Sequence, residues 1–306
     1  MDNAAVEVEV VHDTRYSYSA PVSQAHHLAH MRPLDDPHQQ VRDFDLRITP
    51  VPSRRVDGVD AFGNACCHFA LAQPHRKLEL RSRSLVSLRP RFETLDAAQS
   101  PPWELLRDRL RYVARAPFDP AVEFVQPSPY VPRLEELRAY GAMSFTPGRP
   151  IAEGALELMR RVHSDFDYLT DSTEIDTPLA TAFAQRSGVC QDFTHVMAGA
   201  LRMLGLPARY VSGYLITQHA LRGPALVGAD ASHAWVQVYC PGTPGVPGAG
   251  WLDLDPTNDV VPSTAHVRLA VGRDYGDVAP LRGIIRGAGR HSLDVGVATR
   301  VLETAR

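Results

Sequence analysis

Three side chains with the chemistry of a nucleophile, a base and an acid stand far apart in the second half of the sequence. Cys190 lies in Ser-Gly-Val-Cys-Gln-Asp-Phe, His233 in Ser-His-Ala-Trp, and Asp255 in Leu-Asp-Leu-Asp-Pro-Thr-Asn. A thiol attacks a carbonyl carbon when a histidine can move its proton, and an acid can orient that histidine. The three residues therefore predict a cysteine-dependent acyl-transfer site.

The sequence around Cys190 predicts that this thiol stands at the start of a helix. Gly188 permits a tight entry, apolar residues then recur at intervals of three and four up to Leu204, and Gly205 followed by Pro207 ends the pattern. A free cysteine has a pKa of about 8.5, and both a helix N-terminus and a neighbouring imidazolium favour its reactive thiolate form. Taken alone, Cys190 could equally be buried and inert, because cysteine is among the most buried residue types.

His233 and Asp255 fall on two strands predicted at 232–239 and 250–255, on either side of a loop rich in glycine and proline at 241–249. If these strands form a hairpin centred on the loop, His233 and Asp255 lie directly opposite each other on one face. Directly opposed Cβ atoms are only about 4.5–5.5 Å apart, so the carboxylate can hold the imidazole. The histidine is the predicted base and the aspartate its predicted orienting acid.

Five further residues near this triad are candidates for substrate contacts: Gln191, Asp192, Gly213, Tyr214 and Trp235. Gly213, Tyr214 and Trp235 could wall a substrate groove, or they could only pack within the sheet. Asp192 could bind a substrate amine, but a helix cap is its favoured role because a negative side chain is stabilised there. Asp253, which shares a face with the predicted acid, is expected nearer Trp235. The backbone N–H of the nucleophile is the predicted oxyanion donor, and the second donor stays open.

The first third of the chain is predicted to form a mostly antiparallel β domain. Strand-like alternation occurs at 5–12, 44–49, 65–72 and 78–88, and turn signals separate these runs. Prolines at the end of this region lead into a predicted helix over 103–113. The next segment, 117–131, carries four prolines and is expected to wrap the surface.

The remaining sequence predicts helices followed by strands. Helices are expected at 150–163, at 177–185 and from Cys190 onward, and strands at 208–215, 232–239, 250–255, 266–271 and 292–302. A helical part packed on an antiparallel sheet gives an α+β fold class. We therefore predict two domains, 1–100 and 101–306, with the C-terminal strands in the second. No flexible linker separates them, which predicts a fixed docking of one on the other.

Several motifs resemble the bacterial transglutaminase-like superfamily. Over residues 150–270 these are Ser-Gly-Val-Cys-Gln-Asp-Phe, Ala-Arg-Tyr-Val-Ser-Gly-Tyr, Ser-His-Ala-Trp-Val and Trp-Leu-Asp-Leu-Asp-Pro-Thr-Asn. Tyr-Ser-Tyr, Met-Arg-Pro and Asp-Ala-Phe-Gly-Asn in the first third resemble the β domain that often precedes this core. The resemblance implies a papain-like thiol-enzyme core in circularly rearranged order, with Cys190 as nucleophile, His233 as base and Asp255 as the third member.

The resemblance leaves the activity open, because the superfamily contains peptidases, amidases and inactive members besides cross-linking enzymes. We expect a peptide or protein substrate whose peptide, isopeptide or glutamine-type amide bond is opened through a thioester. Hydrolysis is slightly favoured over transfer to an amine, since transfer needs a site that excludes water. The alternative of another class is a binding or scaffold protein in which the triad is blocked.

The overall composition excludes some partners. With 44% hydrophobic residues, 22% charged residues and a net charge of −3, the 306-residue chain is expected to be globular, without attraction to nucleic acid or to an anionic membrane. The first residues lack the basic and apolar regions of a secretory leader, and the adjacent cysteines 66 and 67 suit no ordinary disulfide framework, so a cytoplasmic location is expected. The oligomeric state stays open.

A dense histidine cluster, His26, His27 and His30, is the one feature of the sequence that suggests a metal. Zinc needs more ligands in a coherent frame, and no cysteine pair, glutamate or further histidine is spaced to complete the set. A surface or interface role is therefore favoured for the cluster. Acidic calcium loops are also missing, so we expect a site that needs neither metal nor cofactor.

Overall fold

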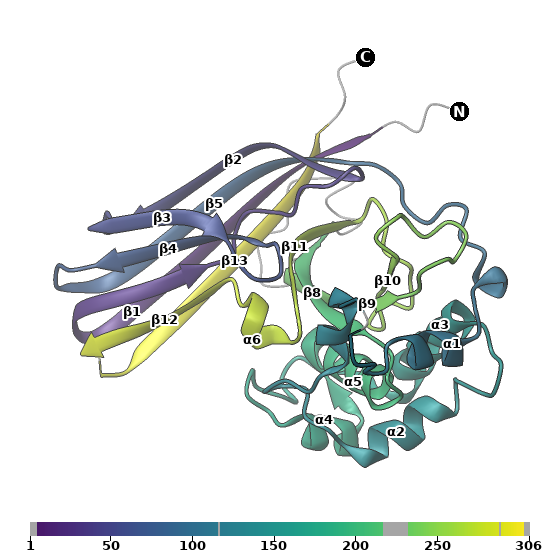
Figure 1. Ribbon diagram of the computed structural model, residues 1–306. Coiled ribbons are helices and arrows are strands. Elements are labelled where there is room, and N and C mark those ends of the chain that lie inside the picture. Colours follow the sequence, from purple (N-terminus) through teal and green to yellow (C-terminus); the bar gives the residue numbers. More distant parts are fainter. Residues whose placement is uncertain (1–4, 116, 217–231, 288, 303–306) are drawn as a thin grey trace.

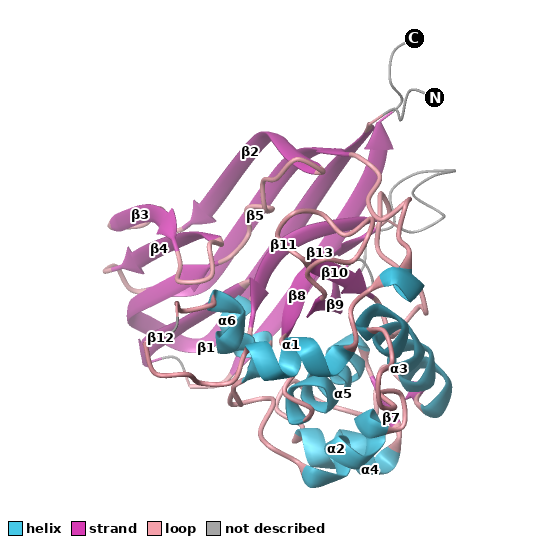
Figure 2. Ribbon diagram, turned by 45° about the vertical axis from the view of Figure 1, so that its right-hand side comes forward, coloured by secondary structure: helices cyan, strands magenta, loops and turns pink. Residues whose placement is uncertain are grey.

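The computed structural model describes residues 5–115, 117–216, 232–287 and 289–302. Within these residues a large antiparallel sheet extends to one side, and a group of helices with a smaller sheet lies at the other (Figures 1 and 2). The predicted fold class, an N-terminal antiparallel β domain followed by a mixed core of helices and strands, is confirmed.

The large sheet is organised around one long strand, β1 (Val6–Ala29). Its main path has the order β2-β5-β1-β4-β3, with β2 at Gln39–Thr49, β3 at Arg54–Val59, β4 at Ala65–Leu71 and β5 at His75–Leu88. The strand predicted at 5–12 is only the beginning of β1. The strand continues past Pro21, because the pairing with β5 becomes irregular between Ser17 and Val22 and accommodates the missing proline N–H there.

Two C-terminal strands complete this sheet. β12 (Leu281–Gly287) and β13 (His291–Leu302) both pair antiparallel with β1, so that Leu302 stands beside Glu7. We expected the strand at 292–302 to belong to the core that begins at residue 101. The large sheet instead contains strands from both sides of the predicted boundary, because β1 offers β13 and β12 the edge that β5 and β4 leave free.

The helices gather at one end of the molecule, as Figure 2 shows. They are α1 (Trp103–Arg109), α2 (Glu135–Ala142), α3 (Ile151–Asp165), α4 (Leu179–Gln185), α5 (Cys190–Met203) and the short α6 (Tyr275–Val278). The first ends four residues before the predicted 113, and the proline-rich segment after it contains a short 3-10 helix over Pro120–Val125. α5 is buried along almost its whole length between α2, α3 and α4 and the smaller sheet.

The smaller sheet has the order β10-β9-β8-β11. Its strands are β8 (Ala208–Leu215), β9 (Ser232–Tyr239), β10 (Trp251–Leu254) and β11 (His266–Gly272), close to the predicted ranges. A short parallel pair, β6 (Asp167–Tyr168) with β7 (Ser187–Gly188), guides the chain into α5. One hydrophobic cluster fills the space between the helices and this sheet, and another joins the two sheets, where Val8 and Val10 of β1 share a core with Val267 and Leu269 of β11.

The predicted register of the β9–β10 hairpin is wrong by two residues. Trp251 pairs with Tyr239 and Leu254 with Val236, so the position opposite Asp255 is that of Trp235 and not that of His233. A shift of two residues keeps every side chain on its face of the sheet, and the hydrophobic pattern therefore cannot detect it. Asp255 itself follows the end of β10 and forms a bridge with Val260.

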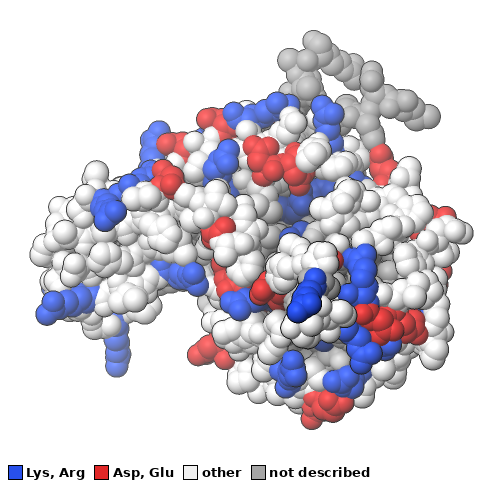
Figure 3. All heavy atoms as spheres, in the orientation of Figure 1, with Lys and Arg blue, Asp and Glu red and all other residues white. Residues whose placement is uncertain are grey.

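Acidic and basic side chains are interspersed over the face of the molecule that Figure 3 shows. Among the described helices, none has both the length and the apolar character needed to cross a membrane. Residues 1–4, which belong to the segment from which the lack of a leader is argued, lie outside the described residues.

Candidate active site

Cys190 is the first residue of α5, as predicted. The backbone N–H of Val189 donates to Asp192 Oδ2 at 2.8 Å, and the Thr173 hydroxyl donates to the same oxygen at 2.7 Å. Burial raises the pKa of the Asp192 carboxyl, while these two donors act in the opposite direction. Asp192 therefore caps the helix, which is the role that the sequence favoured over the binding of an amine.

Two neighbours fix the chain on either side of the thiol. A Cβ added to Gly188 would lie 2.5 Å from Asp192 Oδ2, so only glycine lets the capping side chain close against the backbone. Gln191 is buried, and its Nε2 donates to the Ile175 carbonyl oxygen at 2.9 Å. Its amide nitrogen thus holds the preceding loop.

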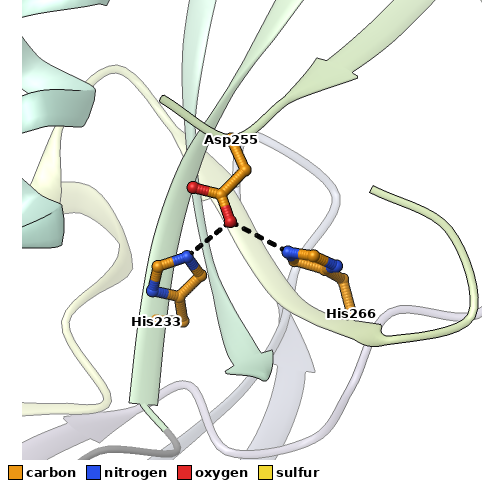
Figure 4. A group of neighbouring side chains, drawn as sticks. All are labelled: His233, Asp255 and His266. Atoms are coloured by element: carbon orange, nitrogen blue, oxygen red, sulfur yellow. Dashed lines mark hydrogen bonds and ion pairs between the residues drawn. The ribbon is translucent and has the colours of Figure 1, made fainter. Parts of the chain in front are cut away.

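His233 lies between Cys190 and Asp255. Its Nε2 is 2.8 Å from Asp255 Oδ2, and its side chain is also hydrogen-bonded to Cys190. Figure 4 shows the second ring nitrogen of His233 on the side away from Asp255. The structure thus brings the three predicted residues together even though the hairpin register is shifted, because Asp255 reaches His233 diagonally from beyond the end of β10.

The charges of these groups support one another. Burial alone would lower the pKa of His233, but the hydrogen bonds and charges of Asp255 and Cys190 raise it to about 10. Burial likewise opposes the ionised form of Asp255, yet its two histidine partners hold the pKa of this carboxyl well below its usual range. A carboxylate and a protonated imidazole therefore stand beside the thiol at neutral pH.

Sequence reasoning missed two further partners of Asp255. His266 Nε2 lies 3.0 Å from Asp255 Oδ2, and Asn258 Nδ2 donates to the same oxygen at 2.8 Å. The backbone N–H groups of Thr257 and Asn258 donate to Oδ1 at 3.0 and 3.2 Å. A histidine at the start of a mostly apolar predicted strand was the available signal for His266, but the sequence does not reveal its partner.

Among the described residues, His233, Asp255 and His266 form a group that could offer three ligand atoms to a metal ion, all within 4.8 Å of one another. In the structure both imidazoles bond directly to the same carboxylate oxygen (Figure 4). These direct hydrogen bonds account for the close approach of the three side chains. The expectation of a metal-independent site stays a prediction.

The N-terminal histidines do not converge on a common point. His26 is exposed, His27 is buried against Phe69 with ring centroids 4.9 Å apart, and His30 is buried with Nε2 3.2 Å from Asp60 Oδ2. The helical spacing of His26 and His30 has no meaning here because both lie on or next to an extended strand. A surface role is therefore wrong for His27 and His30, and the interface alternative stays a prediction.

A pocket of about 390 Å³ opens at Cys190 and His233. One wall comes from the core, including Gly213 and Tyr214, and the other comes from β1 and β13 of the large sheet. The large sheet thus forms one side of the pocket.

Trp235 does not line this pocket. It is fully buried, its indole N–H donates to Asp253 Oδ1 at 2.8 Å, and its ring stacks beside that of His233 with centroids 6.1 Å apart. A Cβ on Gly213 would overlap the Val267 carbonyl oxygen and the Trp235 ring. Gly213 is therefore required for the close packing behind His233, and Trp235 supports that histidine from within the sheet.

The other three cysteines lie in different surroundings. Cys66, Cys67 and Cys240 are buried, whereas Cys190 is partly exposed. Burial, with a smaller effect of Asp57, raises the pKa of the Cys67 thiol to about 12, and burial raises the pKa of Cys240 strongly. Among the described residues, Cys190 is thus the one cysteine that combines access with a histidine partner.

Family models and known proteins match most of this chain. Residues 8–87 match the bacterial transglutaminase-like N-terminal region, and residues 142–256 match the transglutaminase-like superfamily. An uncharacterized protein of Mycobacterium tuberculosis (strain H37Rv) is 37% identical over 293 residues, which cover 94% of this chain and 90% of that protein. An uncharacterized protein of Mycobacterium leprae is 34% identical over 296 residues, which cover 94% and 96%.

Two further proteins carry names that describe an activity. A protein-glutamine gamma-glutamyltransferase of Pseudomonas aeruginosa is 37% identical over 120 residues, which cover 37% of this chain and 17% of that protein. A crystal structure from Cytophaga hutchinsonii, provisionally named a cysteine protease, has a TM-score of 0.74 at 22% identity, and covers 99% of this chain and 92% of that one. The chain therefore belongs to the transglutaminase-like superfamily and carries the bacterial N-terminal region of that family.

Proposed function

We propose that this protein is a thiol acyl-transfer enzyme that opens an amide bond of a peptide or protein. The proposal rests on one observation: Cys190, His233 and Asp255 are linked in that order by hydrogen bonds, and the thiol is open to a pocket. These three side chains fit the roles of nucleophile, proton carrier and orienting acid.

The reaction follows from the protonation state of these three side chains. The Cys190 thiolate attacks the carbonyl carbon and forms a C–S bond, while the backbone N–H of Cys190 donates to the developing oxyanion. Protonated His233 gives its proton to the leaving nitrogen as the C–N bond breaks, and a thioester remains. His233 then takes a proton from water, the resulting hydroxide opens the thioester, and the acid product leaves with the thiolate restored.

Hydrolysis is the favoured outcome of the second step. Asp192, the predicted contact for a substrate amine, is already used as the cap of α5, and none of the described residues that line the pocket is an aspartate or a glutamate. The names of the two relatives support acyl chemistry and point to different acceptors, water for a protease and an amine for a glutamyltransferase. Transfer to an amine is thus the second candidate.

A silent binding or scaffold protein is the alternative of another class. The partial exposure of Cys190 and the pocket that reaches it argue against a site blocked by the described residues. Alkylation with iodoacetamide tests this alternative, because a blocked or inert thiol would not react in the folded protein.

Quantitative alkylation followed by mass spectrometry is the first experiment. We expect Cys190 to react before the other three cysteines, and Cys190→Ala to abolish turnover of a peptide library while Cys66→Ala leaves it unchanged. Reaction of Cys66, Cys67 or Cys240 ahead of an inert Cys190 would show that the nucleophile is wrongly assigned. Addition of a primary amine then separates the two enzyme functions by the product formed.

A further inference from the structure

We infer that the pocket at Cys190 selects an acyl group that is uncharged and carries a large apolar side chain close to the scissile carbonyl. The inference rests on the proposed function and adds the chemical class of its substrate. It starts from the composition of the pocket wall, which is built jointly by the two sheets.

The wall beside the thiol is apolar and aromatic. Its principal side chains come from β1, β11, β12, β13 and α6: Tyr16, Leu269, Tyr275, Leu281, Leu293 and Val295. Among the described residues that line the pocket, none is an aspartate, glutamate, lysine or arginine. Apart from Cys190 and His233, these residues contribute no formal charge that could bind an ionic group.

Three polar side chains of the wall are hydrogen-bonded to one another. His12 Nδ1 is hydrogen-bonded to the Tyr214 hydroxyl at 3.0 Å, and His12 Nε2 to the Thr14 hydroxyl at 3.2 Å. Burial lowers the pKa of His12 to about 4, so this imidazole is neutral at pH 7. Burial also raises the pKa of the Tyr210 and Tyr214 phenols, which therefore stay protonated.

These surroundings discriminate between substrates. A lysine or glutamate side chain entering the pocket would lose its water without gaining a counter-charge, which opposes binding. A leucine or phenylalanine side chain gains from the removal of its apolar surface from water. In an apolar pocket even one methylene changes kcat/KM by about 10- to 200-fold, so we expect at least about tenfold preference for an apolar group.

The wall can be altered at a residue that is not one of the three catalytic residues. Leu293 of β13 lies in the wall, and 46% of its surface is exposed, so a polar side chain is tolerated there. Leu293→Glu places a carboxylate in the pocket without touching Cys190, His233 or Asp255. Ile284→Glu is the matched control, because Ile284 lies on the neighbouring β12, is 81% exposed and is not part of the pocket.

The experiment uses a series of peptidyl acyloxymethyl ketones that alkylate the active-site thiol. The side chain beside the ketone is leucine, phenylalanine, lysine or glutamate, and each inactivation rate is divided by the rate of the same probe with a small free thiol. We expect the leucine and phenylalanine probes to inactivate at least about tenfold faster than the charged probes. Leu293→Glu should slow the leucine probe and accelerate the lysine probe, while Ile284→Glu should behave as the unaltered protein.

Equal rates for all four probes, or faster inactivation by a charged probe, would overturn the inference while leaving the proposed function intact. A change in probe preference in Ile284→Glu as large as that in Leu293→Glu would also overturn the inference. The proposed function fails in a different way, when neither the probes nor iodoacetamide labels Cys190 in the folded protein.

Discussion

Replacement of Asp255 by asparagine tests the electrostatic logic of the site. The rise of the His233 pKa from 6.5 to about 10 corresponds to about 5 kcal/mol of preference for the protonated imidazole. Asparagine keeps the shape of the side chain and removes the negative charge that counteracts the effect of burial on the pKa of His233. If the pKa of His233 returns to 6.5, the protonated fraction of the imidazole beside the thiol at pH 7.5 falls from nearly all to about one tenth.

The pH dependence of this change has a definite sign. A raised pKa means that the protonated His233 contributes its stabilisation fully below pH 6.5 and loses it as the pH rises towards 10. In Asp255→Asn, burial then dominates, and the protonated form should disappear near or below pH 6.5. The rate of Cys190 alkylation by iodoacetamide, measured from pH 5 to 10, should therefore fall at neutral pH in the variant and not in the parent protein.

Asp253→Asn provides a matched control for this prediction. Asp253 is another buried carboxylate of the same chain segment, but it accepts from the Trp235 indole and lies 3.6 Å from the Arg91 guanidinium. The Asp253→Asn substitution should lower the melting temperature of the protein and leave the pH profile of Cys190 alkylation unchanged. A profile of Asp255→Asn that superimposes on the parent profile, or a shift in Asp253→Asn instead, would refute the reasoning.

Four other predictions follow from the same geometry. His266→Phe should lower turnover about tenfold or more and shift the pH profile of Cys190 alkylation, because a hydrogen bond to a buried charge is lost. His266→Gln should restore much of the turnover and of the profile. Equal behaviour of the two variants would mean that His266 contributes only packing. Gly188→Ala should lower the free energy of unfolding in urea by about 1–3 kcal/mol and slow the alkylation of Cys190, since the new Cβ overlaps Asp192. Gly58→Ala is the control: no atom lies within 4 Å of its added Cβ, so the alkylation rate should be unchanged. Full activity is expected in EDTA, and recovery of lost activity by one specific metal would redirect attention to the histidines around Asp255. A chain that begins at Pro101 should be insoluble or inactive, because it lacks the β1 strand on which β12 and β13 pair, and a soluble, cooperatively melting and active core would contradict this.

The sequence predicts best what depends on local pattern. The start of α5 at Cys190 follows from Gly188 before it, from the apolar repeat within it and from Gly205 at its end. The core strands follow from their alternation. By contrast, the hairpin register was missed because a slip of two residues preserves the pattern, and the correct pairing of His233 with Asp255 depended on Asp255 extending beyond the strand.

Features that depend on pairing between distant parts of the chain could not be predicted from the sequence. His266 lies on β11 and reaches Asp255 in a sheet whose strand order, β10-β9-β8-β11, no local pattern defines. The pairing of β13 with β1 joins residues almost 300 positions apart, for example Glu7 with Leu302. Trp235 could be assigned to a groove or to the sheet with equal reason, and its bond to Asp253 places it within the sheet.

The position of β13 in the chain sets the order in which the site is completed during synthesis. The thiol, the imidazole and the carboxylate all emerge from the ribosome before residue 291, where β13 begins. Leu293 and Val295, which form part of the pocket wall, emerge later and find their place only by pairing with β1, the strand made first. A polypeptide interrupted between β11 and β13 carries every reactive group but lacks the surface that receives the substrate. The reactive groups are therefore paired with a complete substrate surface only after the opposite ends of the described chain have met.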